Sequence, residues 1–247
     1  MVGSTSKKYN VPPPQIPRPI TYDGILKKYS CLKKNREIEV KFNSDYDISE
    51  TMDNLKLPKC LKLIDENKET KIHTFYYHDN KYKFSSSKKI KLKSSINKII
   101  VNDITFLIRH EYFFNIAYLN MFINDSIINK QIEVSRNRHL KIFEYQKSFL
   151  NTFVFHKKPF NFAMTFDICE NLSSPIKVCD VIDGITHIKE YFPKLFQVEF
   201  EILQDHYSQS DLTYMTEAIK DIFQLNNLNT LQQSTLTKYG WALGENT

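Results

Sequence analysis

The chain has 247 residues, of which 41% are hydrophobic and 25% are charged, enough to bury one sizeable core. Its 18 Phe and 14 Tyr exclude a chain that is disordered throughout. No stretch approaches the roughly 18 uninterrupted apolar residues of a membrane-spanning helix. With only 5 Gly, the glycine-rich phosphate loops of P-loop and Rossmann proteins cannot be assembled, so phosphates must be bound by side chains. The net charge of +6 is compatible with a polyanionic partner.

The cysteines and the first residues bear on the compartment. Cys31, Cys60, Cys169 and Cys179 form no C-x-x-C pair, which argues against a zinc ribbon or a disulfide framework. The N-terminus lacks the apolar segment of a signal peptide. We therefore expect an intracellular protein with reduced thiols and no membrane association.

The elements are expected in the following order. Residues 1–20 are Pro-rich and predict a flexible tail, and helix-like spacing follows over 22–34 and 48–66. Pro58 interrupts the second range, so a short helix and a turn are expected there. Most of the remainder predicts short strands, at 35–43, 70–78, 81–85, 88–93, 97–101, 104–114, 131–139, 151–156, 160–169 and 194–203. A helix opens at Ser210 or Asp211 and ends at Asn226-Asn227. We expect residues 21–227 to form one β-rich domain, and 228–247 to be a linker or an artificial extension.

Two of these strands carry acidic residues on one face and apolar residues on the other. In residues 36–42, Glu37, Glu39 and Lys41 alternate with Ile38, Val40 and Phe42. In residues 196–202, the same alternation places Gln197, Glu199 and Glu201 on one face. An ordinary solvated surface is the simplest alternative. Like charges on one face repel, however, and carboxylates on two such facing strands suit Mg²⁺ or Mn²⁺.

This pair of strands resembles the triphosphate tunnel metalloenzymes. A Glu-x-Glu-x-Lys first strand with a late Glu-x-Glu strand is similar to the viral and fungal RNA triphosphatases, particularly the mimivirus-like domains of capping enzymes from giant DNA viruses. The resemblance spans roughly residues 30–205. It implies an α+β, β-rich fold: a closed antiparallel barrel of about eight strands, with a polar lumen and a few flanking helices. It also implies that Glu37, Glu39, Glu199 and Glu201 bind the metal.

A lumen that binds a triphosphate also requires basic residues at alternating positions. Arg109 and Glu111 share a face of residues 105–113, Arg136 and Arg138 form an Arg-x-Arg pair, and Asp167 lies among apolar neighbours. Glu133 alternates away from both arginines, so one regular strand cannot point all three inward. The lysines of the Lys-x-Lys pairs, Lys81, Lys83, Lys91 and Lys93, fit a solvated edge at least as well.

The resemblance implies hydrolysis of the γ-phosphate of 5′-triphosphate RNA, the first step of mRNA capping, and also of NTP. In that scheme Glu37, Glu39, Glu199 and Glu201 hold Mg²⁺ or Mn²⁺, and Glu111 or Glu201 orients the attacking water. Phosphate oxygens contact Lys41, Arg109, Arg136, Arg138, Lys83 and Asp167. Guanylyltransferase and methyltransferase domains are expected outside this chain. If the protein is viral, it is expected in the host cytoplasm (a viral factory) or in the virion.

Three alternatives remain open on the sequence. The first is a tripolyphosphatase or another triphosphate hydrolase of the same fold. The second is a non-catalytic domain that binds nucleic acid through exposed aromatic residues. The third is a purely structural viral protein.

Overall fold

The computed structural model describes residues 33–78, 83–87, 89–94, 96–118, 120, 130–146, 160–182, 185–204 and 207–245. The predicted tail at 1–20, most of the predicted helix at 22–34 and the predicted strand at 151–156 lie outside these residues. No helix within the described ranges is both long enough and apolar enough to cross a membrane.

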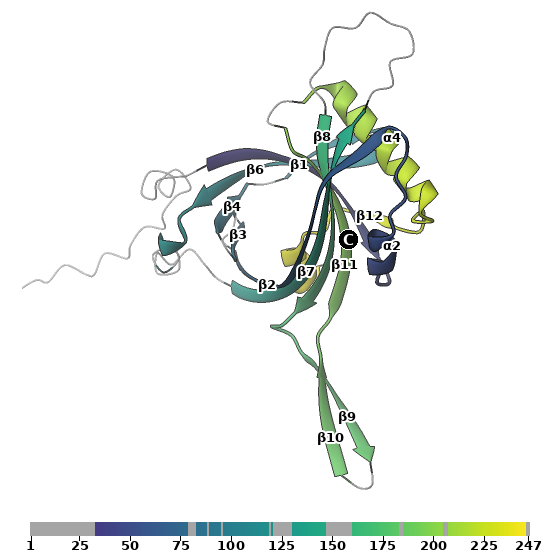
Figure 1. Cartoon of the computed structure of the whole chain (residues 1–247). Coiled ribbons are helices and arrows are strands. Elements are labelled where there is room, and N and C mark those ends of the chain that lie inside the picture. The colour runs from purple at the N-terminus through teal and green to yellow at the C-terminus, as the bar shows by residue number, and fades with distance from the viewer. Residues whose placement is uncertain are drawn as a thin grey trace, which may run out of the picture.

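A single antiparallel sheet of ten strands makes up most of the molecule (Figure 1). Its order is β12-β1-β11-β8-β7-β2-β3-β4-β6-β5, and β1 pairs additionally with β6. The strands are β1 (Lys33–Ser44), β2 (Leu61–His78), β3 (Lys83–Ser86), β4 (Ile90–Lys93), β5 (Asn97–Val101), β6 (Ile104–Phe114), β7 (Lys130–Tyr145), β8 (Phe160–Asn171), β11 (Lys194–Ile202) and β12 (Gln232–Ser234).

The sheet curls into a half-barrel, in which seven strands turn through 207°. The predicted β-rich class and antiparallel curl are confirmed, whereas the prediction of a closed barrel is wrong. Hydrogen bonding does continue from β2 through β3 and β4 to β6, and from β6 to β1. Because β3 and β4 have only four residues each, they provide a short wall beside the long strands β2 and β7.

The apolar core lies on the convex face of the sheet. Val40 and Phe42 from β1 and Phe200 from β11 are buried there, as the strand alternation predicts. The helix α4 (Gln209–Leu225) packs its apolar stripe on this face and buries Met215 and Phe223. A capping box between Ser208 and Asp211 starts the helix. With the core outside, the concave face is left to polar side chains.

Residues 48–66 contain the expected short helix and turn, but they also contain the start of a strand that was not expected. Within 48–66, only α2 (Ser49–Asp53) is helical, and β2 begins at Leu61. Register shifts lie between Leu63 and Asp65 and between Glu69 and Ile72, so this part of β2 lacks a regular two-residue alternation. A short 3₁₀ turn, η1 (Ile116–Tyr118), follows β6.

Two further features were not predicted. The strands β9 (Ile176–Ile182) and β10 (Ile185–Tyr191) form a separate hairpin that projects from the body of the molecule (Figure 1). In addition, residues predicted as a linker fold against the sheet: β12 pairs with β1, and α5 (Lys238–Ala242) lies on the concave side. The prediction of a linker or extension over 228–247 is therefore wrong for the described residues to 245.

Candidate active site

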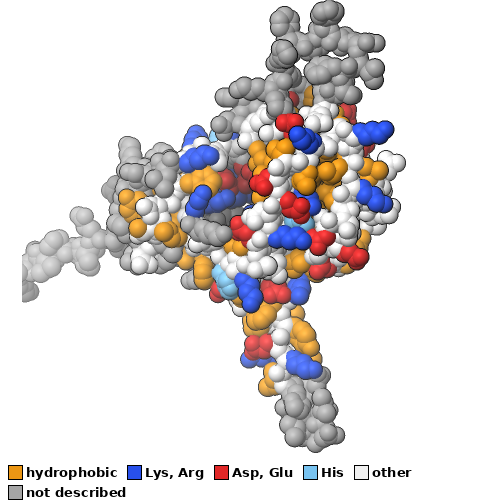
Figure 2. Space-filling model, viewed as in Figure 1, with side chains coloured by type: hydrophobic (Ala, Val, Ile, Leu, Met, Phe, Trp, Pro, Cys, Tyr) orange, Lys and Arg blue, Asp and Glu red, His pale blue; other side chains and the backbone are white. Residues whose placement is uncertain are grey.

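Charged side chains gather in the hollow of the curled sheet (Figure 2). The cavity has a volume of about 130 Å³ and is lined from β1, β2, β4, β6, β7, β11 and the start of α5. The β1 residues that alternation predicts on the acidic face, Glu37, Glu39 and Lys41, all line it and are at most 6% exposed. The acidic face is therefore the lumen and not a solvated surface.

Glu37 belongs to an ion-pair network that joins β1 to β6 and β4. Arg109 lies directly opposite Glu37 and donates a hydrogen bond from Nε to Oε2, and its Nη2 lies 2.7 Å from Glu39 Oε1. Lys93 Nζ lies 3.1 Å from Glu37 Oε1. Burial favours the neutral carboxyl, but Arg109 and Lys93 outweigh it and hold the pKa of Glu37 well below its usual range.

Two acidic residues on neighbouring strands lie directly opposite each other. Glu201 on β11 is the direct partner of Glu39 on β1, a position at which side chains are about 5 Å apart. Burial, followed by the charges of Glu37, Glu39 and Glu111, raises the pKa of Glu201 to about 8. Glu201 is therefore mostly protonated at neutral pH, whereas Glu39 is paired with Arg109 and Lys41.

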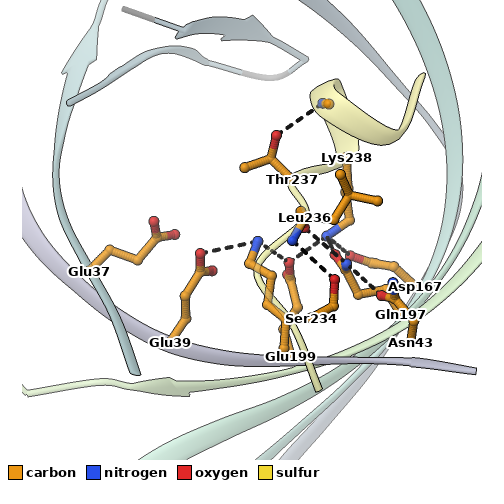
Figure 3. A network of polar contacts seen from close by, with 12 residues as sticks. Glu37, Glu39, Asn43, Asp167, Gln197, Glu199, Ser234, Leu236, Thr237 and Lys238 are labelled. Carbon is orange, nitrogen blue, oxygen red and sulfur yellow. Dashed lines mark hydrogen bonds and ion pairs between the residues drawn. The ribbon is translucent and has the colours of Figure 1, made fainter. Parts of the chain in front are cut away.

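Glu199 lies one pair further along β11, and it is held by two lysines (Figure 3). Lys41 Nζ lies 2.8 Å from Glu199 Oε1, and Lys238 Nζ lies 2.7 Å from the same atom. Although burial favours the neutral acid, Lys238 and Lys41 keep the pKa of Glu199 well below its usual range. Glu199 therefore holds Lys41 and Lys238 in place, and its expected role as a metal ligand stays a prediction.

Asp167 is the most enclosed acid of the lumen, with no exposed surface. Arg138 donates two hydrogen bonds of 2.8 Å to its two oxygens, and Lys238 Nζ lies 3.0 Å from Oδ2. Arg136 lies 3.7 Å from Oδ2 and donates a hydrogen bond to Thr74. Asp167 is therefore a buried counter-charge that holds Arg138, Lys238 and Arg136 in place, and its expected contact with phosphate stays a prediction.

The structure brings most of the predicted residues together. The lumen contains all five predicted glutamates, Asp167, Lys41, Arg109, Arg136 and Arg138. Glu133 lies on the outer face and contacts His73, which agrees with the predicted alternation. Lys83 lies in β3 opposite Lys93, but its side chain is outside the described residues.

Three basic residues of the lumen were missed or misjudged: Lys91, Lys93 and Lys238. Lys93, which the alternation left as an edge lysine, lies 2.5 Å from Glu111 and 3.1 Å from Glu37. Lys238 lies in a segment too short and too polar to predict as structure. The sequence signal was Thr237, whose side chain caps α5 by accepting a hydrogen bond from the amide of Gly240.

The donor atoms present suit a hard divalent cation. Glu39 Oε1 and Glu111 Oε1 are buried and accept no hydrogen bond, although each lies near a basic group. Carboxylate oxygens are the ligands that Mg²⁺ and Mn²⁺ prefer. Among the residues described, no group of three or more His, Cys, Asp or Glu is arranged so that it could hold a metal ion. Binding a cation therefore requires Glu37 or Glu39 to exchange a basic partner for it.

The lumen is close to electrically balanced. Among its described residues there are six carboxylates and seven basic side chains: Glu37, Glu39, Glu111, Asp167, Glu199 and Glu201 against Lys41, Lys91, Lys93, Arg109, Arg136, Arg138 and Lys238. Because the pKa of Glu201 is raised to about 8, this group is mostly neutral at pH 7, and the surplus is about two positive charges, which do not offset the roughly four negative charges of a triphosphate. A divalent cation would supply most of the difference.

Comparison with known proteins gave no relative: no protein-family model matches the chain, and no curated protein matches it.

Proposed function

We propose that this lumen binds the triphosphate end of an RNA or a nucleotide and hydrolyses its γ-phosphate in a reaction that requires Mg²⁺ or Mn²⁺. The observation that supports this most directly is the buried set of carboxylates on β1, β6 and β11, flanked by buried Lys and Arg. Such a set is costly to fold unless it binds a charged ligand, because buried ion pairs contribute little net stability.

The cation site is best supplied by Glu39 and Glu201, which face each other, with Glu37 and Glu111 beside them. A bound divalent ion would neutralise charge on the transferred phosphoryl group. This assignment differs from the sequence-based one in the place of Glu199, which Lys41 and Lys238 hold instead.

The basic side chains bind and orient the phosphate oxygens in this proposal. Arg109 and Arg138 offer planar guanidinium groups that suit two-point contacts with phosphate, and their paired acids fix their orientation. Lys41, Lys93 and Lys238 supply point charges from three sides. These groups are already in place before substrate binds, so they can stabilise the negative charge that develops in the transition state of phosphoryl transfer.

A carboxylate whose pKa is raised towards neutrality is suited to accept a proton from water. Glu201 meets this condition only while it does not coordinate the cation, because its pKa of about 8 belongs to the metal-free lumen. Glu111 is the neighbouring candidate for orienting the water.

The test is phosphate release from γ-labelled 5′-triphosphate RNA, ATP and tripolyphosphate, with Mg²⁺, with Mn²⁺ and with EDTA. We expect metal-dependent release that Glu39→Gln reduces at least 100-fold, the size typical of losing one preorganised charged group. The matched control is Glu133→Gln on the outer face of the sheet, which we expect to leave activity unchanged. Absence of release from all three substrates with either metal would overturn the proposal. Release from tripolyphosphate alone would restrict it to an inorganic tripolyphosphatase.

A further inference from the structure

The lumen differs between its two ends. Along β1 the inward row runs from Lys33 through Asn35, Glu37, Glu39 and Lys41 to Asn43. At the Asn43 end, Gln197 donates hydrogen bonds to Asn43 and to the carbonyl oxygen of Leu236, just before α5 (Figure 3).

The helix α5 covers the same end of the lumen. Tyr239 and Ala242 are buried against Ile132 and Val134 of β7 and Leu195 of β11. The lining is apolar here, and the helix shields it from water. A substrate is therefore best accommodated from the opposite end.

A second cavity lies at the Lys33 end. It has a volume of about 480 Å³, and small-molecule pockets typically have volumes of roughly 300–1,000 Å³. Its lining includes Lys33, Asn35, Lys89 and Phe113. Phe113 is the cross-strand partner of Lys33 and of Lys91, and Lys91 also lines the catalytic cavity. The two cavities are thus consecutive along the same strands.

The chemistry of this second cavity is that of a nucleotide site. Lys91 Nζ lies 5.0 Å and Lys89 Nζ lies 5.9 Å from the centre of the Phe113 ring. Aromatic rings beside basic groups are how proteins bind single-stranded nucleic acid without reading its sequence. Asn35 Oδ1 is buried without a hydrogen-bond donor, so it is available to a hydroxyl or amino group. Lys33 lies four residues from Glu37, about 13 Å along an extended strand.

We infer that this cavity, here called the mouth subsite (Lys33, Asn35, Lys89 and Phe113), binds the first nucleotide of the RNA chain that carries the triphosphate. The base stacks on Phe113, and Lys33 and Lys89 contact the next phosphodiester. The inference rests on the proposed function, and it deepens it by making RNA ends better substrates than tripolyphosphate.

The test compares kcat/KM for 5′-triphosphate RNA and for tripolyphosphate in Phe113→Leu, which retains an apolar side chain but removes the aromatic face. We expect about a tenfold loss with the RNA, as for one lost base-stacking contact, and less than a twofold change with tripolyphosphate. Phe113→Tyr should restore the RNA value. Tyr191→Ala, an exposed aromatic on the distant hairpin, is the control and should change neither substrate.

Equal losses on both substrates, or no loss with RNA, would overturn the mouth subsite while leaving the proposed hydrolase intact. If the wild-type protein hydrolyses none of the substrates, the proposed function fails. The mouth subsite is then tested by measuring the binding of labelled 5′-triphosphate RNA by fluorescence anisotropy. Two results would support the mouth subsite. Phe113→Leu should bind the RNA about tenfold more weakly, and Lys89→Ala should lower the slope of log affinity against log salt concentration by about one. Unchanged affinity and slope would overturn it.

Discussion

The direct pairing of Glu39 with Glu201 makes stability depend on pH in an unusual direction. A glutamate in the unfolded chain titrates near 4.5, whereas burial and the charges of Glu37, Glu39 and Glu111 raise the pKa of Glu201 to about 8. Between these values the folded protein binds one more proton than the unfolded chain does. Lowering the pH from 8 to 6 therefore stabilises the metal-free protein, with a slope of at most about 1.4 kcal/mol per pH unit. Urea unfolding in EDTA at several pH values measures this slope.

The matched variant is Glu201→Gln, which is neutral at every pH. We expect it to remove most of the slope between pH 6 and 8 and to raise the free energy of unfolding at pH 8. Glu170→Gln changes a partly exposed glutamate on β8 that contacts Lys194, and it should leave the slope as it is. An unchanged slope in Glu201→Gln would mean that another group titrates.

Asp167 should contribute more to stability than any exposed acid of this chain. It has no exposed surface and contacts Arg138, Lys238 and Arg136. Asp167→Asn leaves these buried cations without their counter-charge, which typically costs about 3–5 kcal/mol. Equilibrium unfolding in urea measures the loss.

Glu190→Gln is the comparison for Asp167→Asn, because it breaks only the exposed contact of Glu190 with Lys177 and should change stability by less than about 1 kcal/mol. Equal effects of the two variants would contradict the assigned role of Asp167.

Among the elements, the β9–β10 hairpin is the clearest addition to the fold. Its strands pair only with each other, and Ile176 and Ile188 are 54% and 62% exposed. We expect that replacing residues 176–191 by a short turn changes the free energy of unfolding by less than about 1 kcal/mol. The reason is that removing the hairpin uncovers little apolar surface on the rest of the protein. Hydrolysis of tripolyphosphate should also be unchanged. A loss of several kcal/mol in urea unfolding would show that the hairpin supports the sheet.

The sequence predicted strands well where alternation is uninterrupted. In β1, charged and apolar residues alternate from Glu37 to Phe42, and both the strand and its two faces were predicted correctly. In β2, the bulge near Lys71, whose φ is 53°, interrupts the period, and the charged residues before it resembled the exposed side of a helix. Short elements carry too few residues for any period, so β12 and α5 were missed.

The same limit applies to the candidate site. Glu37, Glu39 and Arg109 were predicted because each lies on a long alternating strand. The role of Lys238 depends on where the chain returns after α4, a long-range property that local patterns do not encode. Glu199 and Glu201 share one pattern but differ in their neighbours, and only the packing of Lys41 and Lys238 separates their roles.

At the scale of the whole molecule, the proposed function implies that the binding of metal and of polyphosphate is interdependent, because of the charge of the lumen. Six carboxylates and seven basic groups nearly cancel, so a triphosphate alone meets a carboxylate-lined wall. A divalent ion alone meets lysines and arginines. Each ligand removes the repulsion that opposes the other, which is positive coupling between two binding events.

We therefore expect Mg²⁺ with a non-hydrolysable triphosphate analogue to raise the melting temperature more than the two separate shifts added together. At 100 times the dissociation constant, a ligand adds about 2.7 kcal/mol, or roughly 5–11 °C for a chain of this size. Differential scanning fluorimetry at constant ionic strength measures the three shifts. Glu39→Gln should abolish the excess, whereas Glu133→Gln should keep it, because Glu133 lies outside the lumen. Strictly additive shifts in the wild-type protein, or an excess that persists in Glu39→Gln, would contradict a shared site for metal and phosphate.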